Sequence, residues 1–259
     1  GQDAIQYHFG TNFTSVTHPA VMTARRSRSI GPRVSRSLFA RAIRVCRAHA
    51  KAHGRLPRLL TPRRFTDKMQ WRKLFDFNPA FPTLCDKLAV RDLIAERVGC
   101  EYLVPLLWSG VPAEIPFERV APPFVLKSSH ASGQVIMVGR DEVLDAAAVR
   151  MRAEGWLSKN YGVARDEPGY EAVPPRLMIE QMLTTETGAR PHELRLFVFD
   201  GKVAVINSVF VEDGRLRNGA FHTTEWTRLN WHFTRAITDR DFPKPTRLAE
   251  MIGVSERLV

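Results

Sequence analysis

The most informative part of this chain for its fold is the stretch Phe124-Val-Leu-Lys-Ser-Ser-His-Ala-Ser-Gly-Gln-Val-Ile-Met-Val138. An apolar run ends at Lys127, a loop of small residues spans positions 128–133, and a second apolar run begins at Val135. This pattern predicts a β-hairpin with a mobile tip whose backbone is accessible. Small side chains let the N–H groups of the loop approach a polyanion, and Lys127 adds a cation beside them. The stretch indicates a triphosphate site, although many solvent-exposed hairpins also carry serine and glycine at their tips.

The composition is that of a globular chain with one or two lobes, since 259 residues with 44% hydrophobic content can bury a sizeable core. No run of 18 apolar residues predicts a membrane span, and no apolar leader predicts secretion. Cys46, Cys85 and Cys100 share no C-x-x-C spacing. They are expected to be free thiols of a reducing compartment, which favours a cytoplasmic location.

The net charge of +11 is concentrated in one segment. Residues 22–64, the basic arm, hold 13 Lys and Arg and no acidic residue, whereas the rest of the chain holds 25 basic and 27 acidic residues. Apolar residues recur at helical spacing in the arm, namely Phe39, Ala42, Ile43, Cys46 and Ala50. This predicts a basic amphipathic helix that lies on the anionic inner face of a membrane, binds an anionic polymer, or packs on the body of the protein. Nucleic acid is the least favoured partner, because no aromatic residues interleave with the arginines.

The remainder of the chain alternates between helical and strand patterns. Helices are predicted at residues 67–75, 84–97, 145–160 and 249–258. Strands are predicted at residues 102–108 and 177–183, and a second hairpin at 193–199 and 202–210 around the turn Asp200-Gly201. Residues 162–175, rich in glycine, aspartate and proline, are expected to form a loop. Antiparallel hairpins between helices predict an α+β fold.

Six blocks carry a family resemblance by their order and spacing. They are Arg64-Phe-Thr-Asp-Lys-Met-Gln-Trp71, Cys85-Asp-Lys-Leu-Ala-Val-Arg91, the 124–133 stretch, Pro175-Arg-Leu-Met-Ile-Glu-Gln-Met-Leu183, Arg195-Leu-Phe-Val-Phe-Asp-Gly-Lys202 and the region of Trp226. From about residue 56 onward the chain resembles the ATP-grasp superfamily, specifically its TupA-like branch, named for teichuronopeptide biosynthesis.

The resemblance implies an ATP-grasp fold of two α+β lobes with antiparallel sheets. The nucleotide lobe is expected at about 116–180 and a second lobe, incomplete at its C-terminal end, at about 181–259. Residues 35–115 are expected to hold the helix of the basic arm and a helical region. Residues 1–34 are expected to be disordered, and Met22 is a candidate start of translation, because the first 21 residues lack lysine, arginine and a clear period.

The resemblance also implies a nucleotide site. It consists of two lysines that neutralise phosphate charge, a loop that folds over the β- and γ-phosphates, and a hinge whose carboxylate, N–H and C=O match the edge of adenine. The residues concerned are Lys87, expected on the helix 84–97, and Lys127, Ser129, His130, Ala131, Ser132, Gly133, Glu180, Gln181 and Leu183.

Two residues are candidates for catalysis. Arg195 occupies a position where the family usually has a lysine, and a cation there can bind phosphate or substrate. His130 can donate to a γ-phosphate oxygen or act in acid–base chemistry, but a lone loop histidine is more often a solvated side chain. Asp166 stands where the family often has an arginine, which leaves the contacts of that loop open.

The implied reaction is ATP-dependent carboxylate–amine ligation through an acylphosphate, with a cell-surface polysaccharide or its amino-acid decoration as product. ATP and Mg²⁺ are the expected cofactors, and a carboxylate and an amine, one of them on an anionic glycan, are the expected substrates. The magnesium ligands of the family are expected in a segment after residue 259, so no metal ligand is assigned. The alternatives are a non-catalytic relic that serves as a nucleotide-binding or scaffold subunit, and a basic peripheral membrane protein.

Overall fold

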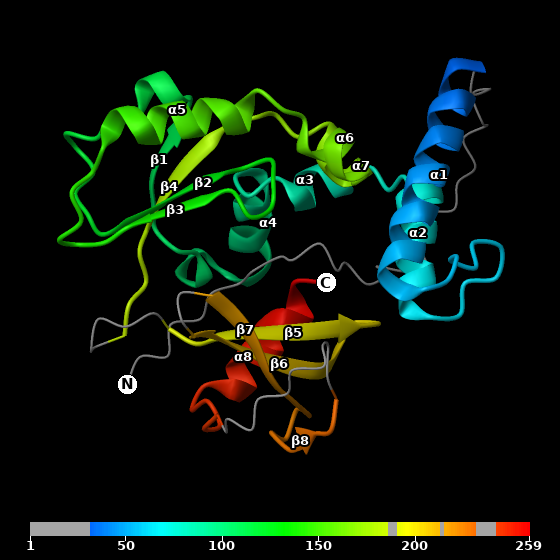
Figure 1. Cartoon of the computed structure of the whole chain (residues 1–259). Helices are drawn as coiled ribbons and strands as arrows, with labels where there is room; N and C mark the ends of the chain where they lie inside the picture. The colour runs from blue at the N-terminus through cyan, green and yellow to red at the C-terminus, as the bar shows by residue number, and fades with distance from the viewer. Residues whose placement is uncertain (1–31, 186–190, 213–214, 232–241) are drawn as a thin grey trace.

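The computed structural model describes residues 32–185, 191–212, 215–231 and 242–259 (Figure 1). Its helices are α1 (Pro32–His53), α2 (Phe65–Phe75), α3 (Phe81–Cys85), α4 (Ala89–Val98), α5 (Ala146–Leu157), α6 (Tyr161–Arg165), α7 (Pro168–Glu171) and α8 (Leu248–Arg257), with 3-10 turns at Cys100–Tyr102 and Pro112–Glu114. Its strands are β1 (Leu106–Gly110), β2 (Phe124–Ser128), β3 (Val135–Val138), β4 (Leu177–Gln181), β5 (Glu193–Phe199), β6 (Lys202–Glu212), β7 (Arg215–His222) and β8 (Arg228–Leu229). The α+β fold with antiparallel sheets is confirmed.

The first sheet has the strand order β1-β4-β2-β3, and all its pairs are antiparallel. Side chains alternate between its faces along each strand. One face carries Phe124, Leu126 and Ile179, all fully buried, and packs against α5, which lies over the sheet in Figure 1. The other face carries Lys127 and Glu180, because Lys127 pairs with Met178 and Val125 with Glu180 in the register of β2 and β4.

The second sheet has the order β5-β6-β7-β8 and contains the predicted hairpin. Asp200 and Gly201 both have positive φ, 51° and 73°, as a tight turn between twisted strands requires. Helix α8 packs on β5 and β6. The same helix also contacts α4 through Val254 and Leu258. It therefore links the second sheet to the part of the chain that precedes the first.

Several segments differ from their predicted form. The strand predicted at 102–108 is β1 at Leu106–Gly110, and β7 and β8 are not among the predicted strands. The helix predicted at 84–97 is divided into α3 and α4, because the backbone of Asp86 is extended and ends α3, while its carboxylate accepts the N–H of Leu88 at 2.9 Å in the turn before α4. Lys87 therefore lies in the turn before α4, not on a helix. The loop predicted at 162–175 contains α6 and α7, which approach so closely that a Cβ on Gly162 would lie 2.5 Å from the backbone nitrogen of Glu171.

The arm helix α1 confirms a helix in the basic arm but not its predicted apolar stripe. Residues 32–34, expected in the disordered segment, begin this helix, whereas residues 1–31, with Met22, lie outside the described residues. Val45 and His49 form its buried face, while Phe39 and Ile43 are 69% and 38% exposed. No helix in the described ranges is long and apolar enough to cross a bilayer.

A buried ion pair joins the basic arm to α2. The guanidinium of Arg55 donates to Asp67 at 2.7 Å and to Thr66 at 3.1 Å, and His49 lies 3.8 Å from the same carboxylate. Asp67 is fully buried. Burial acts to raise the pKa of Asp67, but Arg55, the backbone N–H of Arg58 and His49 outweigh it and lower the pKa.

Replacing this carboxylate should destabilise the docked arm. We expect Asp67→Asn to lower the melting temperature clearly, because Arg55 loses its charged partner in the interior. The lowered pKa adds stability above the ordinary aspartate pKa of about 4, which is lost as the pH falls through the folded value. Wild type should therefore lose more stability on acidification than the variant in thermal melts. Asp92→Asn, at an exposed site on α4, is the control, and equal melting temperatures for both variants would contradict this role.

Candidate functional site

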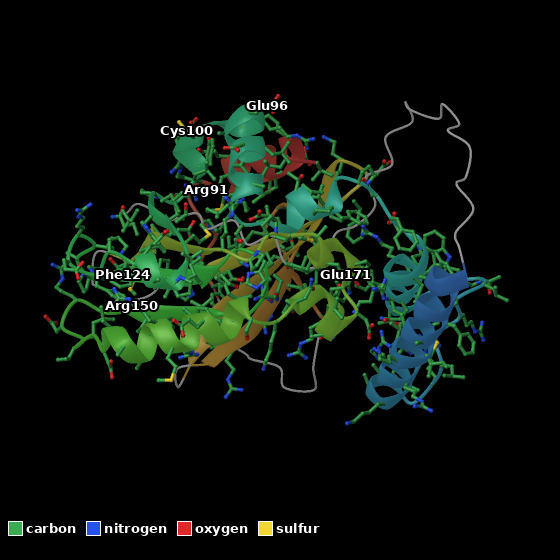
Figure 2. All side chains as sticks on the ribbon, turned by 90° about the horizontal axis from the view of Figure 1, so that it is seen from above. Arg91, Glu96, Cys100, Phe124, Arg150 and Glu171 are labelled. Atoms are coloured by element: carbon green, nitrogen blue, oxygen red, sulfur yellow. The ribbon has the colours of Figure 1, made fainter. Side chains whose placement is uncertain are left out.

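A buried carboxylate, Glu180, lies between two cations on the open face of the first sheet. The Nζ of Lys127 donates to its Oε2 at 2.7 Å, and the guanidinium of Arg91 donates to its Oε1 at 2.9 Å. The three side chains are at most 15% exposed. Arg91, in the first turn of α4, lies between that helix and the sheet in Figure 2 and also donates to the carbonyl of Val104 at 2.7 Å. Each carboxylate oxygen has its own donor, and one positive charge is left over.

Lys87 adds a further cation next to this cluster. Its Nζ donates to the carbonyl oxygens of Ser128, at 3.0 Å, and Ala131, and its backbone N–H donates to Ser129 at 3.1 Å. Burial, and then repulsion by Lys127, lower the pKa of Lys87 to about 8. In this conformation the ammonium binds the backbone of the loop, so the loop and the turn before α4 are tied together.

The loop at 128–133 differs from the mobile tip that its sequence predicts. Its first four residues are at most 3% exposed, whereas Ser132 and Gly133 are exposed. The N–H of Ser129 donates to Arg176 at 2.8 Å and its hydroxyl to Pro174 at 3.3 Å, so the segment before β4 covers the loop. The backbone N–H groups of residues 130–133 donate no hydrogen bond within the described ranges. His130 and Ala131 are buried, so in this conformation only Ser132 and Gly133 present their backbone at an exposed position.

His130 lies at the inner side of the loop. Its Nε2 is 3.3 Å from the carbonyl oxygen of Trp156 at the end of α5. Burial lowers the pKa of His130, which keeps the imidazole neutral near pH 7. A neutral ring can donate one hydrogen bond, and here the nearest acceptor is the backbone of α5.

The predicted hinge residues follow Glu180 at the end of β4. Gln181 is exposed, and its N–H donates to Pro105 at 3.0 Å. Leu183 is partly buried, and its backbone makes no hydrogen bond within the described part of the chain.

Arg195 is not brought to this cluster. It lies on β5 in the second sheet, where its Nε donates to Glu193 at 2.7 Å. Among the described residues it makes no ion pair with Glu180 and no hydrogen bond to the loop. The structure thus groups Lys87, Lys127, Glu180 and the loop.

Sequence reasoning missed Arg91. The residue stands inside one of the quoted blocks, four positions after Lys87, but its partner Glu180 lies 89 residues away. A buried glutamate paired with a buried lysine can indicate that a second cation is needed beside it, but the sequence does not show which residue supplies that cation.

Comparison with known proteins assigns the family. A family model described as TupA-like ATPgrasp matches residues 67–259, which is most of the chain. The search of curated proteins and the search of solved structures found no match. The match spans both sheets, the Lys127–Glu180 cluster, the loop and α8. The chain therefore belongs to the TupA-like ATP-grasp family.

Proposed function

We propose that this protein is an ATP-dependent carboxylate–amine ligase. The observation that carries the proposal is the excess of positive charge at the loop: Lys87, Lys127 and Arg91 surround one carboxylate, next to four backbone amides that donate no hydrogen bond within the described ranges. Such a site favours a polyanion, because cations and free amides together bind phosphate oxygens. Family membership implies ATP as that polyanion.

The proposed roles follow from the position of each group. Lys127 would bind an inner phosphate, and Lys87 would exchange its carbonyl partners for phosphate oxygens as the loop folds over the β- and γ-phosphates. Adenine would lie beside Val125, which is partly exposed on the face of the sheet that carries Lys127 and Glu180. Glu180 and the backbone of Leu183 would supply an acceptor, a donor and a second acceptor to its edge.

In the proposed reaction a substrate carboxylate oxygen attacks the γ-phosphorus, ADP leaves, and an acylphosphate forms. An amine then attacks the acyl carbon, inorganic phosphate leaves, and the amine gives up a proton as the amide forms. Arg195 would balance charge on the transferred phosphoryl group or the substrate, and His130 would exchange its hydrogen bond to the carbonyl of Trp156 for one to a phosphate oxygen. An acid or amine on a cell-surface polysaccharide is the proposed larger substrate.

Membership of an ATP-grasp family implies a divalent metal together with ATP in general. Within the described residues, no group of three or more histidine, cysteine, aspartate or glutamate side chains could hold a metal ion. The described side chains therefore do not fit a magnesium site, and no step is assigned to one here.

A second role is supported by the exposed face of α1. Phe39 and Ile43 lie on that face together with the exposed cations Arg47 and Lys51. Apolar side chains flanked by cations are typical of helices that lie on anionic lipid. We therefore propose that the basic arm holds the enzyme at an anionic membrane surface, where lipid-linked glycans are assembled.

The nucleotide site is tested by removing its lysines one at a time. We expect Lys127→Met and Lys87→Met each to weaken ATP binding by about 10- to 150-fold, which corresponds to a charge-assisted contact of roughly 1.5–3 kcal/mol. Isothermal titration calorimetry measures this, with Lys159→Met, an exposed lysine near the end of α5, as the matched control. Wild-type affinity in both variants would overturn the proposed ATP site.

The pKa of Lys87 predicts a proton uptake on binding. The free protein holds Lys87 about half protonated near pH 8, and phosphate oxygens stabilise the charged form. ATP binding at pH 8 should therefore take up about half a proton, and its affinity should fall as the pH rises further. Titrations in two buffers of different ionisation enthalpy measure the uptake. Lys87→Met should abolish it, and an unchanged uptake in that variant would show that another group titrates.

The membrane role of the basic arm is tested on vesicles that contain anionic lipid. We expect the double variant Arg47→Ala/Lys51→Ala to weaken vesicle binding about 30-fold at low salt, since each basic residue near the surface contributes about 1 kcal/mol. Added salt should weaken binding of the wild type as well. Phe39→Ser tests the apolar contribution, and Lys159→Ala is the control. Binding that is insensitive to salt and to the double variant would contradict an electrostatic role.

A further inference from the structure

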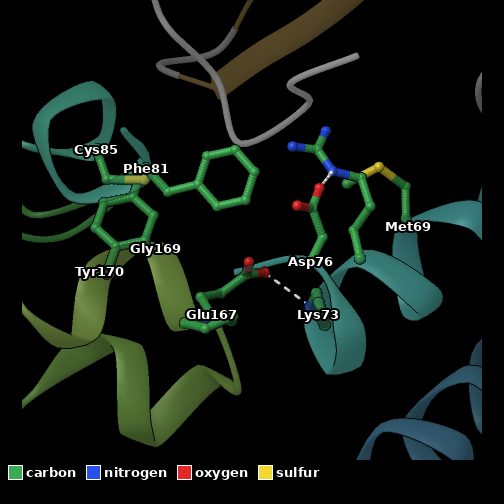
Figure 3. Close-up of a pocket in the computed structure, with 10 residues that line it drawn as sticks. Met69, Lys73, Asp76, Phe81, Cys85, Glu167, Gly169 and Tyr170 are labelled. Atoms are coloured by element: carbon green, nitrogen blue, oxygen red, sulfur yellow. Dashed lines mark hydrogen bonds and ion pairs between the residues drawn. The ribbon is translucent and has the colours of Figure 1, made fainter. Parts of the chain in front are cut away.

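A pocket between α2, α3 and α7 has no part in the proposed ATP site. It has a volume of about 60 Å³, and Figure 3 shows Phe81 and Tyr170 on one side of it and Met69, Lys73 and Asp76 on the other. The remaining lining residues are Arg72, Cys85, Glu167, Pro168 and Gly169.

Four charged side chains line this pocket in two pairs. The Nε of Arg72 donates to Asp76 at 3.0 Å, and the Nζ of Lys73 lies 2.7 Å from Glu167. All four are between 19% and 31% exposed, so they border the pocket without being fully solvated. The pocket is thus neutral in sum but strongly dipolar, with two positive and two negative groups around one small space.

The guanidinium of Arg72 has donors that are not used. Only its Nε–H makes a hydrogen bond within the described residues, and its Nη1 is buried without a partner. The group is held in place, because it lies over the ring of Phe81 at 4.9 Å from the ring centroid. A planar guanidinium with free N–H groups is suited to a carboxylate.

The rest of the lining is uncharged. Burial raises the pKa of the Cys85 thiol to about 12, and burial likewise raises the pKa of Tyr170. The wall depends on Gly169, because a Cβ there would lie 2.8 Å from the sulfur of Cys85. Uncharged side chains on one side of the pocket and charged pairs on the other favour a ligand that has a small apolar part.

The pocket adjoins the proposed nucleotide site through the chain itself. Cys85 ends α3, and Lys87, which holds the loop, follows two residues later. A ligand in the pocket would therefore lie near the phosphate-binding lysine.

We propose that this pocket binds a small free α-amino acid as the zwitterion, with its carboxylate on Arg72 and its ammonium on Glu167 and Asp76. A single water needs about 10–15 Å³ of such volume, so the pocket holds roughly four to six non-hydrogen atoms. Glycine and alanine have about that size. This inference rests on the proposed ligase function, in which the amino acid would be the amine substrate.

Calorimetry or ligand-observed NMR on the full chain tests the assignment with glycine, alanine and two blocked analogues. N-acetylalanine lacks the ammonium and alaninamide lacks the carboxylate, so each should bind at least tenfold more weakly than alanine. Arg72→Met and Glu167→Gln should each weaken alanine binding at least tenfold. The controls Lys68→Met and Glu96→Gln, at exposed positions of α2 and α4, should not. Absence of binding by both amino acids, equal binding of the blocked analogues, or alanine affinity unchanged in both pocket variants would overturn the proposal.

The same preparations separate this proposal from the ligase function. ATP affinity should be unchanged in Glu167→Gln, a substitution of nearly equal shape whose melting temperature verifies folding. ATP binding without amino-acid binding would overturn the pocket assignment and leave the ligase proposal standing. Amino-acid binding that depends on Arg72 and Glu167, without ATP binding, would support the pocket and overturn the ligase.

Discussion

The structure depends on the neutralisation of one buried carboxylate. Glu180 is 7% exposed on a sheet strand, and a charge so placed is tolerated only when it is paired and hydrogen-bonded. Lys127 comes from the neighbouring strand and Arg91 from α4, so the pairing fixes how that helix lies on the sheet. The position of α4 in turn sets the turn that holds Lys87 and the surface on which α8 packs. Loss of either cation would leave one oxygen of this buried carboxylate without its donor, at a cost of roughly 1–3 kcal/mol.

The same arrangement explains how the loop of the proposed site can be closed in this conformation and still bind a phosphate. The ammonium of Lys87 donates to two backbone carbonyls, which are neutral acceptors, and burial disfavours the charged form of this side chain. A phosphate oxygen offers the same ammonium a charged acceptor, so the attraction between opposite charges is added to the hydrogen bond. Exchange of partners would release the loop from the turn and expose its free amides together. Ligand binding and loop movement would thus be one event.

Local pattern was sufficient for β2 to β6, because the apolar runs on either side of the 128–133 loop and the turn at Gly201 are encoded within a few residues. It did not predict β7 and β8, and the strand expected at 102–108 begins only at Leu106. The division at Asp86 was missed, since its extended backbone and its hydrogen bond to Leu88 are not encoded in the apolar period. The burial of the loop was missed for a different reason: serine, alanine and glycine are typical of exposed tips, and the segment near Arg176 that covers them is about 45 residues away. Arg91 was not assigned because its role exists only in the folded pair.

Ion pairs, and not the apolar pattern, set the orientation of the helix α1 in the basic arm. Asp166, at a position where the family resemblance often has an arginine, accepts Arg44 at 2.6 Å, and Arg41 pairs with Glu171. An arginine at position 166 would repel both partners. Partly exposed pairs of this kind contribute at most about 1 kcal/mol each to stability, so they set the orientation of α1 more than they stabilise its packing. They hold Arg41 and Arg44 of α1 against Glu171 of α7 and Asp166 at the end of α6, and Phe39, which packing of the apolar stripe on the body would bury, stays exposed.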